Sequence, residues 1–159
     1  ILVYGAGVHK FVPNRNEVVD ELRKKGFKIK VFGRGWTKHP DTFGFIEGEG
    51  LSKEICQSHI LLDITNGKTA WGHRVFESSA RATPVLTYER EDTKQMFNDS
   101  SEIMLYNSFD QLESKLSIYL HMPKTLRQIG LNAQKRCYAE HDISVRIQEL
   151  IQIIKEIKL

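Results

Sequence analysis

The chain has 159 residues, a formal net charge of +3 and 40% hydrophobic residues, which is typical of one globular domain. Its 23 basic and 20 acidic side chains are interspersed, so no basic stripe that would bind a nucleic-acid backbone stands out. No apolar run reaches the roughly 20 residues that span a bilayer, and no secretory signal pattern opens the sequence. We therefore expect a soluble, cytoplasmic domain with no nucleic-acid partner and no transmembrane segment.

Strands and helices are predicted to alternate through residues 1–107. Apolar, β-rich stretches recur at 1–4, 28–32, 43–46, 60–64, 84–88 and 103–106, and helical patterns lie between them at 14–25, 52–58, 72–81 and 92–97. Near-continuous apolar strands are typical of a sheet that is buried on both faces. Alternation with short connections predicts a doubly wound α/β fold with a parallel sheet of about six strands. Because the sequence opens directly on a core strand, we also expect a segment upstream of it.

Residues 108–159 are predicted to form additional C-terminal helices, so that a single domain spans 1–159. Ser108 opens a capping box with Gln111, a second helix runs from 124 to about 137, and Asp142 can cap the last helix. That last helix carries an apolar stripe from Ile143 to Ile157. One interpretation packs the stripe on its own sheet. The other leaves it exposed for a missing domain, and in the isolated chain it would then promote a homo-oligomer.

The two cysteines, Cys56 and Cys137, lie far apart in the sequence and have no C-x-x-C or histidine-rich neighbourhood. This pattern argues against a zinc site and fits a reducing compartment. We expect both residues to be buried free thiols.

In an open parallel sheet, ligands bind outside the carboxyl ends of the strands. After the first strand comes a turn containing Gly7, which leads through Lys10 to a helix with Arg15 in its first turn. Backbone N–H groups and the helix dipole favour an anion there. As a nucleotide signal the turn is weak, because Lys10 stands where a dinucleotide fingerprint has its third glycine. A tight turn with solvated cations explains these residues equally well.

The loop after the second strand contains Gly33, Gly35 and Trp36. Its glycines permit close backbone approach, and the Trp36 ring offers a flat surface for a base or a sugar. On the residues alone, we favour a hydrophobic plug at the sheet edge as the role of Trp36. The following stretch, 45–48, offers backbone groups for a base edge and has no other specific feature.

The segment 65–77 carries the most polar chemistry in the chain. Residues three and four apart on a helix share a face, so Glu77 neighbours both His73 and Arg74. Such a carboxylate can accept hydrogen bonds from a ribose diol while the cations meet a diphosphate. A surface ion-pair cluster that also includes Arg81 is the alternative. The candidate ligand-binding residues of the segment are Lys68, Gly72, His73, Arg74 and Glu77.

Several chemistries have no motif in this chain. No D-x-D pair is present to hold a diphosphate through a metal, so we expect no metal and no cofactor. Neither the G-x-x-x-x-G-K-[ST] loop of P-loop nucleotidases nor the G-x-S-x-G elbow of hydrolases occurs. Phosphate charge would then be met by Lys10, Arg15, Lys68, His73 and Arg74.

Taken together, these residues resemble the C-terminal, Rossmann-like domain of GT-B glycosyltransferases, and most closely the CgeB-like branch of the group 1 family. The resemblance covers nearly the whole chain, and its most specific element is the R-x-F-E run from Arg74 to Glu77. It also rests on Asn14-Arg15, on 30–36, on 60–64 with the polar loop that follows, on 72–77, on 83–87, and on His141 with Arg146.

The resemblance implies that Glu77 matches the second glutamate of the E-x7-E motif, which holds the ribose hydroxyls of the donor. The position of the first glutamate is occupied by Thr69, so retaining or inverting stereochemistry stays open. Ala82 stands where a glycine is usual before Thr83-Pro84. The implied donor-binding set is Gly7, Lys10, Arg15, Trp36, Lys68, Gly72, His73, Arg74 and Glu77, and the catalytic residues are unknown.

The implied function is that of a metal-independent, hexosyltransferase-like enzyme whose substrate is a nucleoside-diphosphate sugar. The N-terminal domain, which carries the acceptor site in such enzymes, is absent from this sequence. We expect the chain to bind donor alone and to transfer sugar only when that domain or a partner chain supplies the other half. A noncatalytic nucleotide-sugar-binding or protein-interaction module is the alternative. A dinucleotide oxidoreductase is disfavoured, because no acidic residue clearly ends the second strand.

Overall fold

A parallel sheet of six strands forms the centre of the computed structural model, which describes residues 1–7, 15–64 and 72–157. The strand order is β3-β2-β1-β4-β5-β6, and every pairing is parallel. The chain therefore starts in the middle of the sheet, builds one edge and then the other, which is the doubly wound arrangement predicted from the sequence. The strands are β1 (Leu2–Tyr4), β2 (Lys30–Phe32), β3 (Thr42–Phe43), β4 (Leu61–Asp63), β5 (Val85–Tyr88) and β6 (Met104–Tyr106).

Helices connect and follow the strands as expected, with some differences at their ends. The strand predicted at 43–46 stops at Phe43, because β2 ends at Phe32 and later residues have no partner to pair with. Residues 45–47 form a loop instead, and the next helix begins four residues before its predicted start at 52, at Gly48. The helices are α1 (Arg15–Lys24), α2 (Gly48–Gln57), α3 (His73–Ser79), α4 (Glu91–Met96), α5 (Phe109–Tyr119), α6 (Pro123–Arg136), the π-helical η1 (Cys137–His141) and α7 (Ile143–Ile157).

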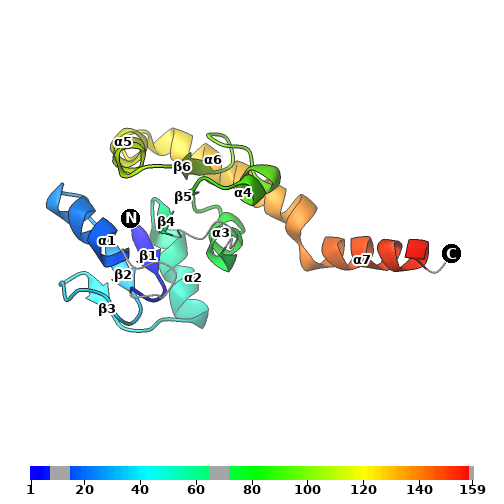
Figure 1. Cartoon of the computed structure of the whole chain (residues 1–159), viewed down its shortest axis with the longest axis horizontal. Helices are drawn as coiled ribbons and strands as arrows, with labels where there is room; N and C mark the ends of the chain where they lie inside the picture. Colours follow the sequence, from blue (N-terminus) through cyan, green and yellow to red (C-terminus); the bar gives the residue numbers. More distant parts are fainter. Residues whose placement is uncertain (8–14, 65–71, 158–159) are drawn as a thin grey trace.

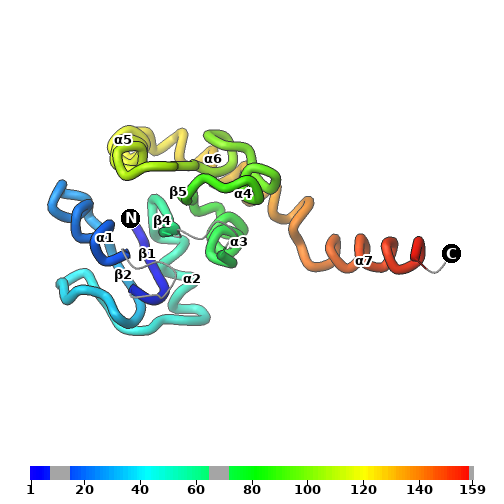
Figure 2. Tube along the Cα trace, viewed as in Figure 1, coloured from blue at the N-terminus to red at the C-terminus, as the bar shows by residue number. Residues whose placement is uncertain are grey.

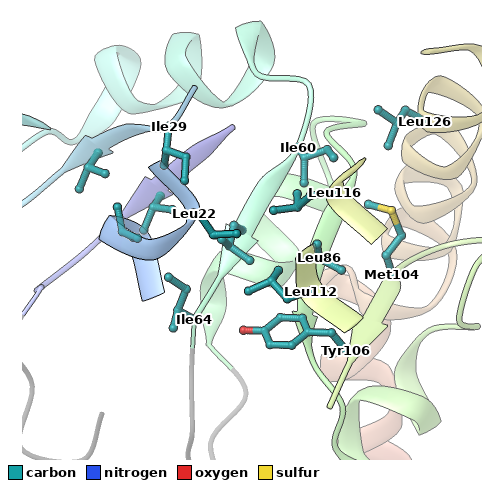
Figure 3. Packing of buried hydrophobic residues seen from close by; sticks show 14 of the residues in the cluster. Leu22, Ile29, Ile60, Ile64, Leu86, Met104, Tyr106, Leu112, Leu116 and Leu126 are labelled. Atoms are coloured by element: carbon teal, nitrogen blue, oxygen red, sulfur yellow. The ribbon is translucent and has the colours of Figure 1, made fainter. Parts of the chain in front are cut away.

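Two hydrophobic clusters cover the two faces of the sheet, because successive side chains on a strand point to opposite sides. One cluster joins Val3, Leu62 and Leu86 to Leu22 of α1 and Leu116 of α5. Figure 3 shows side chains from these helices meeting those of the strands. The other cluster joins alternate strand residues to α2, α3 and α6; its members include Leu2, Tyr4, Phe32, Ile55, Leu61, Val75, Val85 and Ala133.

Side-chain caps begin two of the C-terminal helices as the sequence predicted. The Ser108 hydroxyl accepts a hydrogen bond from the Gln111 N–H at 3.2 Å, and the Gln111 side chain accepts from the Asn107 N–H at 3.0 Å. At the start of α7, the Asp142 carboxylate accepts from the Ser144 N–H at 2.9 Å. The pKa of Asp142 is lowered, chiefly by hydrogen bonds from the Ser144 side chain and backbone.

The last helix extends away from the rest of the molecule (Figure 1), and the chain turns at η1 to enter it (Figure 2). None of the residues of α7 is buried. Its isoleucine and leucine side chains range from 44% exposed at Ile154 to 77% at Ile157. Packing of this stripe on its own sheet is therefore wrong for this chain, because the stripe is exposed; docking on another domain or on a second copy stays a prediction. No helix in the described ranges combines the length and apolar character needed to cross a membrane.

The cysteine prediction is correct for one residue and wrong for the other. Cys137 is a buried free thiol, and burial raises its pKa to about 11. Cys56 is also free, but it is exposed. The reason is its place on α2, where Ile55 turns into the core and its immediate neighbour must turn outward.

Candidate functional site

A cleft of about 640 Å³ opens at the carboxyl ends of β1, β2 and β3, beside α3. This edge lies next to the β1–β4 boundary, where the strand order reverses and doubly wound sheets bind their ligands. The volume falls within the range of small-molecule sites. Its walls are residues 4–6, 32–34 and 45–47, with Leu51, His73, Arg74 and Glu77.

Glycine backbone forms the floor of the cleft, where the first two loops meet. Gly33 has a φ of +133°, and a Cβ there would lie 1.9 Å from the Gly5 carbonyl oxygen. Gly5 in turn lies against Arg74, since a Cβ on Gly5 would lie 2.8 Å from Nη2 of that side chain. Gly33 must be glycine because it meets backbone, and the φ values of +133° at Gly33 and +113° at Gly5 favour glycine at both positions. Gly5 and Gly33 thus allow the backbone of the two loops and the Arg74 guanidinium to lie close together at the cleft.

A buried ion pair fixes Arg74. Its Nη1 lies 3.0 Å from Oδ1 of Asp63, whose side chain is fully buried at the end of β4. The Thr87 hydroxyl donates to the other carboxylate oxygen at 3.1 Å. The guanidinium also lies 5.7 Å from the centre of the Tyr4 ring. Sequence reasoning did not identify Asp63 as a site residue, although an acidic residue closing an apolar strand was the available signal.

A hydrogen bond from Tyr4 holds the Glu77 carboxylate. The Tyr4 hydroxyl donates to Glu77 Oε2 at 2.6 Å, the short distance of a hydrogen bond to a charged acceptor. Burial and this hydrogen bond raise the pKa of Tyr4 above its ordinary value, so the hydroxyl stays protonated and donates. The alternative interpretation, a surface ion-pair cluster of Glu77 with Arg74 and Arg81, does not match these partners. Arg74 turns to the buried Asp63, and Arg81 donates to the main-chain oxygen of Glu77 at 2.7 Å.

Arg15 lies outside the cleft lining and has a structural role. It is 4% exposed, its Nε donates to the Ile64 carbonyl at 2.7 Å, and its Nη1 donates to the Ala6 carbonyl at 2.8 Å. Burial and the nearby Arg74 charge lower its pKa to about 10, so it stays charged at neutral pH. These bonds tie together the ends of β1 and β4. This structural role of Arg15 differs from the sequence prediction, in which Arg15 helps to bind a diphosphate.

Trp36 and Gly7 lie against each other beside Gly5 and do not line the cleft. The Trp36 Nε1 donates to the Gly5 carbonyl at 2.7 Å, and the ring packs against the core cluster of α1 and α5, across the sheet from Tyr4 and Phe32. A Cβ on Gly7 would lie 2.6 Å from this ring. The contacts match a hydrophobic plug rather than a surface for a base.

The remaining predicted residues divide between the described and the undescribed parts of the chain. His73 is exposed and lines the cleft, whereas Gly72 caps α3 without lining it. Lys10 and Lys68 lie outside the described residues, in the segments that join β1 to α1 and β4 to α3. Across 1–7, 15–64 and 72–157, no group of three or more His, Cys, Asp or Glu side chains is placed to hold a metal ion.

Comparison with known proteins gives one family and several structures. The model of a family described as glycosyl transferase-like matches residues 15–152. Anabaena HepE, solved in complex with UDP-glucose, aligns with a TM-score of 0.78 at 11% identity, over 98% of this chain and 48% of its own. A search of curated proteins found no match.

Two further structures show the same fold. Sucrose-phosphate synthase from Thermosynechococcus elongatus aligns with a TM-score of 0.79 at 14% identity, over 98% of this chain and 45% of its own. The C-terminal domain of a group 1 glycosyl transferase, LpcC from Francisella tularensis, aligns at 0.67 and 13% identity, over 89% and 86%. The chain thus spans about half the length of HepE and of the synthase. At these identities the likeness establishes the fold alone, that of the C-terminal half of GT-B enzymes.

Proposed function

Because the chain belongs to the glycosyl transferase-like family, we propose that it is the donor-binding domain of a metal-independent GT-B glycosyltransferase. Its substrate is a nucleoside-diphosphate sugar, and the sugar passes to an acceptor held elsewhere. The observation that carries the proposal is the cleft at the carboxyl edge of the sheet, into which α3 places Arg74 and Glu77 side by side. One face of one helix there offers a carboxylate and a fixed guanidinium.

Glu77 is suited to a ribose. A carboxylate only accepts hydrogen bonds, and the 2′ and 3′ hydroxyls of a ribose are two adjacent donors. The Tyr4 hydroxyl occupies Oε2, so Oε1 is the oxygen that we assign to the ligand. Phe45, Ile46 and Leu51 also line the cleft, and their apolar side chains suit the flat face of a base.

Arg74 and His73 are the described groups that we assign to the diphosphate. Arg74 presents a planar fork of N–H donors, the geometry that matches phosphate oxygens. The charged residues among the described lining balance, with Arg34 and Arg74 set against Glu47 and Glu77. The charge of a diphosphate therefore calls for further cations, for which the sequence offers Lys10 and Lys68.

The proposal includes binding without a metal ion. In the described part of the cleft, the Glu77 carboxylate accepts from Tyr4 and the nearby Asp63 carboxylate pairs with Arg74. Each carboxylate is already engaged by a donor, which supports the proposal that cations and not a metal ion meet the diphosphate. Chelation with EDTA should leave nucleotide affinity nearly unchanged. A large loss that magnesium or manganese restores would contradict this part of the proposal.

The acceptor side belongs to a second domain or a partner chain. HepE and the synthase are each about twice the length of this chain, which supports that arrangement. We assign the exposed apolar stripe of α7 to contact with that second domain or partner chain. The CgeB-like branch and a hexosyl donor stay predictions that rest on the sequence resemblance.

Nucleotide binding by the isolated chain tests the donor site. UDP, GDP, ADP and their sugars are titrated calorimetrically into the chain and into E77Q, which keeps an acceptor for Tyr4 but loses the charge. A hydrogen bond to a charged acceptor contributes about 1.5 to 3 kcal/mol, so E77Q should weaken the best ligand about tenfold to a hundredfold. The matched control is E113Q, because Glu113 is a carboxylate on α5 whose partner, Lys25, lies in the turn after α1.

Two outcomes would overturn the donor-site assignment. The first is that no nucleoside diphosphate binds. The second is that one binds and E77Q retains wild-type affinity like E113Q. A transfer assay with the upstream domain supplied then separates an enzyme from a noncatalytic binding module, since only the enzyme releases nucleoside diphosphate in the presence of acceptor.

A further inference from the structure

Tyr4 makes a contact with the cleft that neither the motifs nor the comparisons assign. It is the last residue of β1 and is 7% exposed, and its ring belongs to the core cluster that includes Phe32 and Val75. Its hydroxyl nevertheless reaches the lining of the cleft and donates to Glu77 Oε2 at 2.6 Å. A side chain that is packed in the core therefore ends in a polar group that contacts a cleft carboxylate.

This contact determines how the Glu77 carboxylate is presented. A glutamate side chain has three rotatable bonds, and ordering the side chain during binding costs rotamer entropy. The Tyr4 ring cannot follow those rotations, because β1 is paired on both sides, with β2 and with β4. The hydrogen bond thus fixes Oε2 before any ligand arrives and leaves Oε1 in one orientation. Ordering that precedes binding need not be repeated during binding.

We propose that Tyr4 is a positioning residue that orients Glu77 toward the ribose and so sets the preference for ribose over deoxyribose nucleotides. The proposal rests on the donor-binding function assigned to the cleft. Tyr4 acts through Glu77 and needs no contact of its own with the ligand. Its ring also lies 5.7 Å from the Arg74 guanidinium, and a phenylalanine would preserve that contact.

Substitution Y4F tests the proposal because it removes the hydroxyl and little else. Calorimetry compares UDP, GDP and ADP, each beside its 2′-deoxy form, on wild type, Y4F and E77Q. Losing the pre-ordering of one long side chain should weaken the best ribonucleotide about threefold to tenfold. Affinity for the 2′-deoxy form should change by less than about twofold, since that ligand has lost a hydroxyl that Glu77 would hold. The ratio of ribonucleotide affinity to 2′-deoxynucleotide affinity should therefore be smaller in Y4F than in wild type.

The matched control is Y106F. Tyr106 also ends a strand, is buried, and donates through its hydroxyl to a main-chain oxygen, that of Asp63, at 3.4 Å. It lies on β6 and does not line the cleft. Y106F should keep the wild-type selectivity. Thermal denaturation of both variants measures the stability that each hydroxyl contributes.

The possible outcomes distinguish a failure of this inference from a failure of the proposed donor-binding function. If E77Q loses ribonucleotide affinity while Y4F keeps wild-type selectivity, Tyr4 contributes only to stability and the inference is wrong. If Y4F weakens ribo and deoxy forms equally, it has disturbed the cleft as a whole and the inference is also wrong. If wild type binds none of the nucleotides, the donor-binding function fails first.

Discussion

Removal of the buried carboxylate at Asp63 should destabilise the domain more than removal of any surface charge. The Asp63 side chain is fully buried and pairs with Arg74 at 3.0 Å, while the Arg74 side chain is 16% exposed. In D63N the shape is kept but the Arg74 charge loses its counter-ion. Breaking a buried pair in this way costs about 3 to 5 kcal/mol. We expect the lower end, about 3 kcal/mol, because Arg74 retains some access to water.

Urea and thermal denaturation of D63N measure this loss. For a domain of this size, about 3 kcal/mol corresponds to a fall in Tm of roughly 6 to 12 °C. The comparison variant is E149Q, which breaks an Arg146–Glu149 pair of 2.8 Å whose side chains are 47% and 53% exposed. An exposed pair of that kind contributes at most about 1 kcal/mol.

The double variant D63N/R74M makes the test specific to the charge. Methionine removes the guanidinium that D63N leaves unpaired, so the double variant should be more stable than D63N alone. If D63N has the same Tm and the same urea midpoint as E149Q, the reasoning is refuted. A double variant whose loss is the sum of the two single losses would also refute it, because the two residues would then be independent.

Two further predictions follow from exposure and burial. In the native protein, a thiol reagent should label the exposed Cys56 at neutral pH and leave Cys137 unlabelled, because the pKa of about 11 keeps the buried Cys137 thiol protonated. Rapid labelling of both thiols before denaturation would contradict this. The chain alone should self-associate through α7, where Leu150 is 56% and Ile154 is 44% exposed, and L150E/I154E should abolish the association; a wild-type chain that sediments as a monomer at every concentration would contradict this.

The sheet was predictable because its signal is local. Buried parallel strands are continuous apolar runs, and those ending at Tyr4, Phe32 and Tyr106 were located to within two residues at either end. The third strand was overestimated, since the apolar character of Phe45 and Ile46 says nothing about whether β2 extends far enough to pair with them.

The cleft was only partly predictable because its contacts join residues far apart in the chain. Glu77, Arg74 and His73 share one helix face, and that spacing is visible in the sequence. The partners that fix Glu77 and Arg74 are Tyr4 and Asp63. They come from different strands, so these contacts depend on strand order and on side-chain orientation at the strand ends.

The last helix shows a second limit of sequence reasoning. A stripe such as that from Ile143 to Ile157 has helical spacing whether it packs on its own sheet or on another domain. Its sequence therefore predicts a helix with one apolar face and does not identify what covers that face. Only the placement of α7 beyond η1 separates the two.

The most direct test of the central claim is a heteronuclear NMR titration of the chain with the nucleoside diphosphate that binds most tightly. A donor site in the cleft predicts saturable shifts of the backbone amides of Gly5, Gly33, Ile46 and Glu77, which line it from four separate segments. Shifts confined to the opposite edge of the sheet, around His59, would contradict the account, as would a spectrum that the nucleotide leaves unchanged.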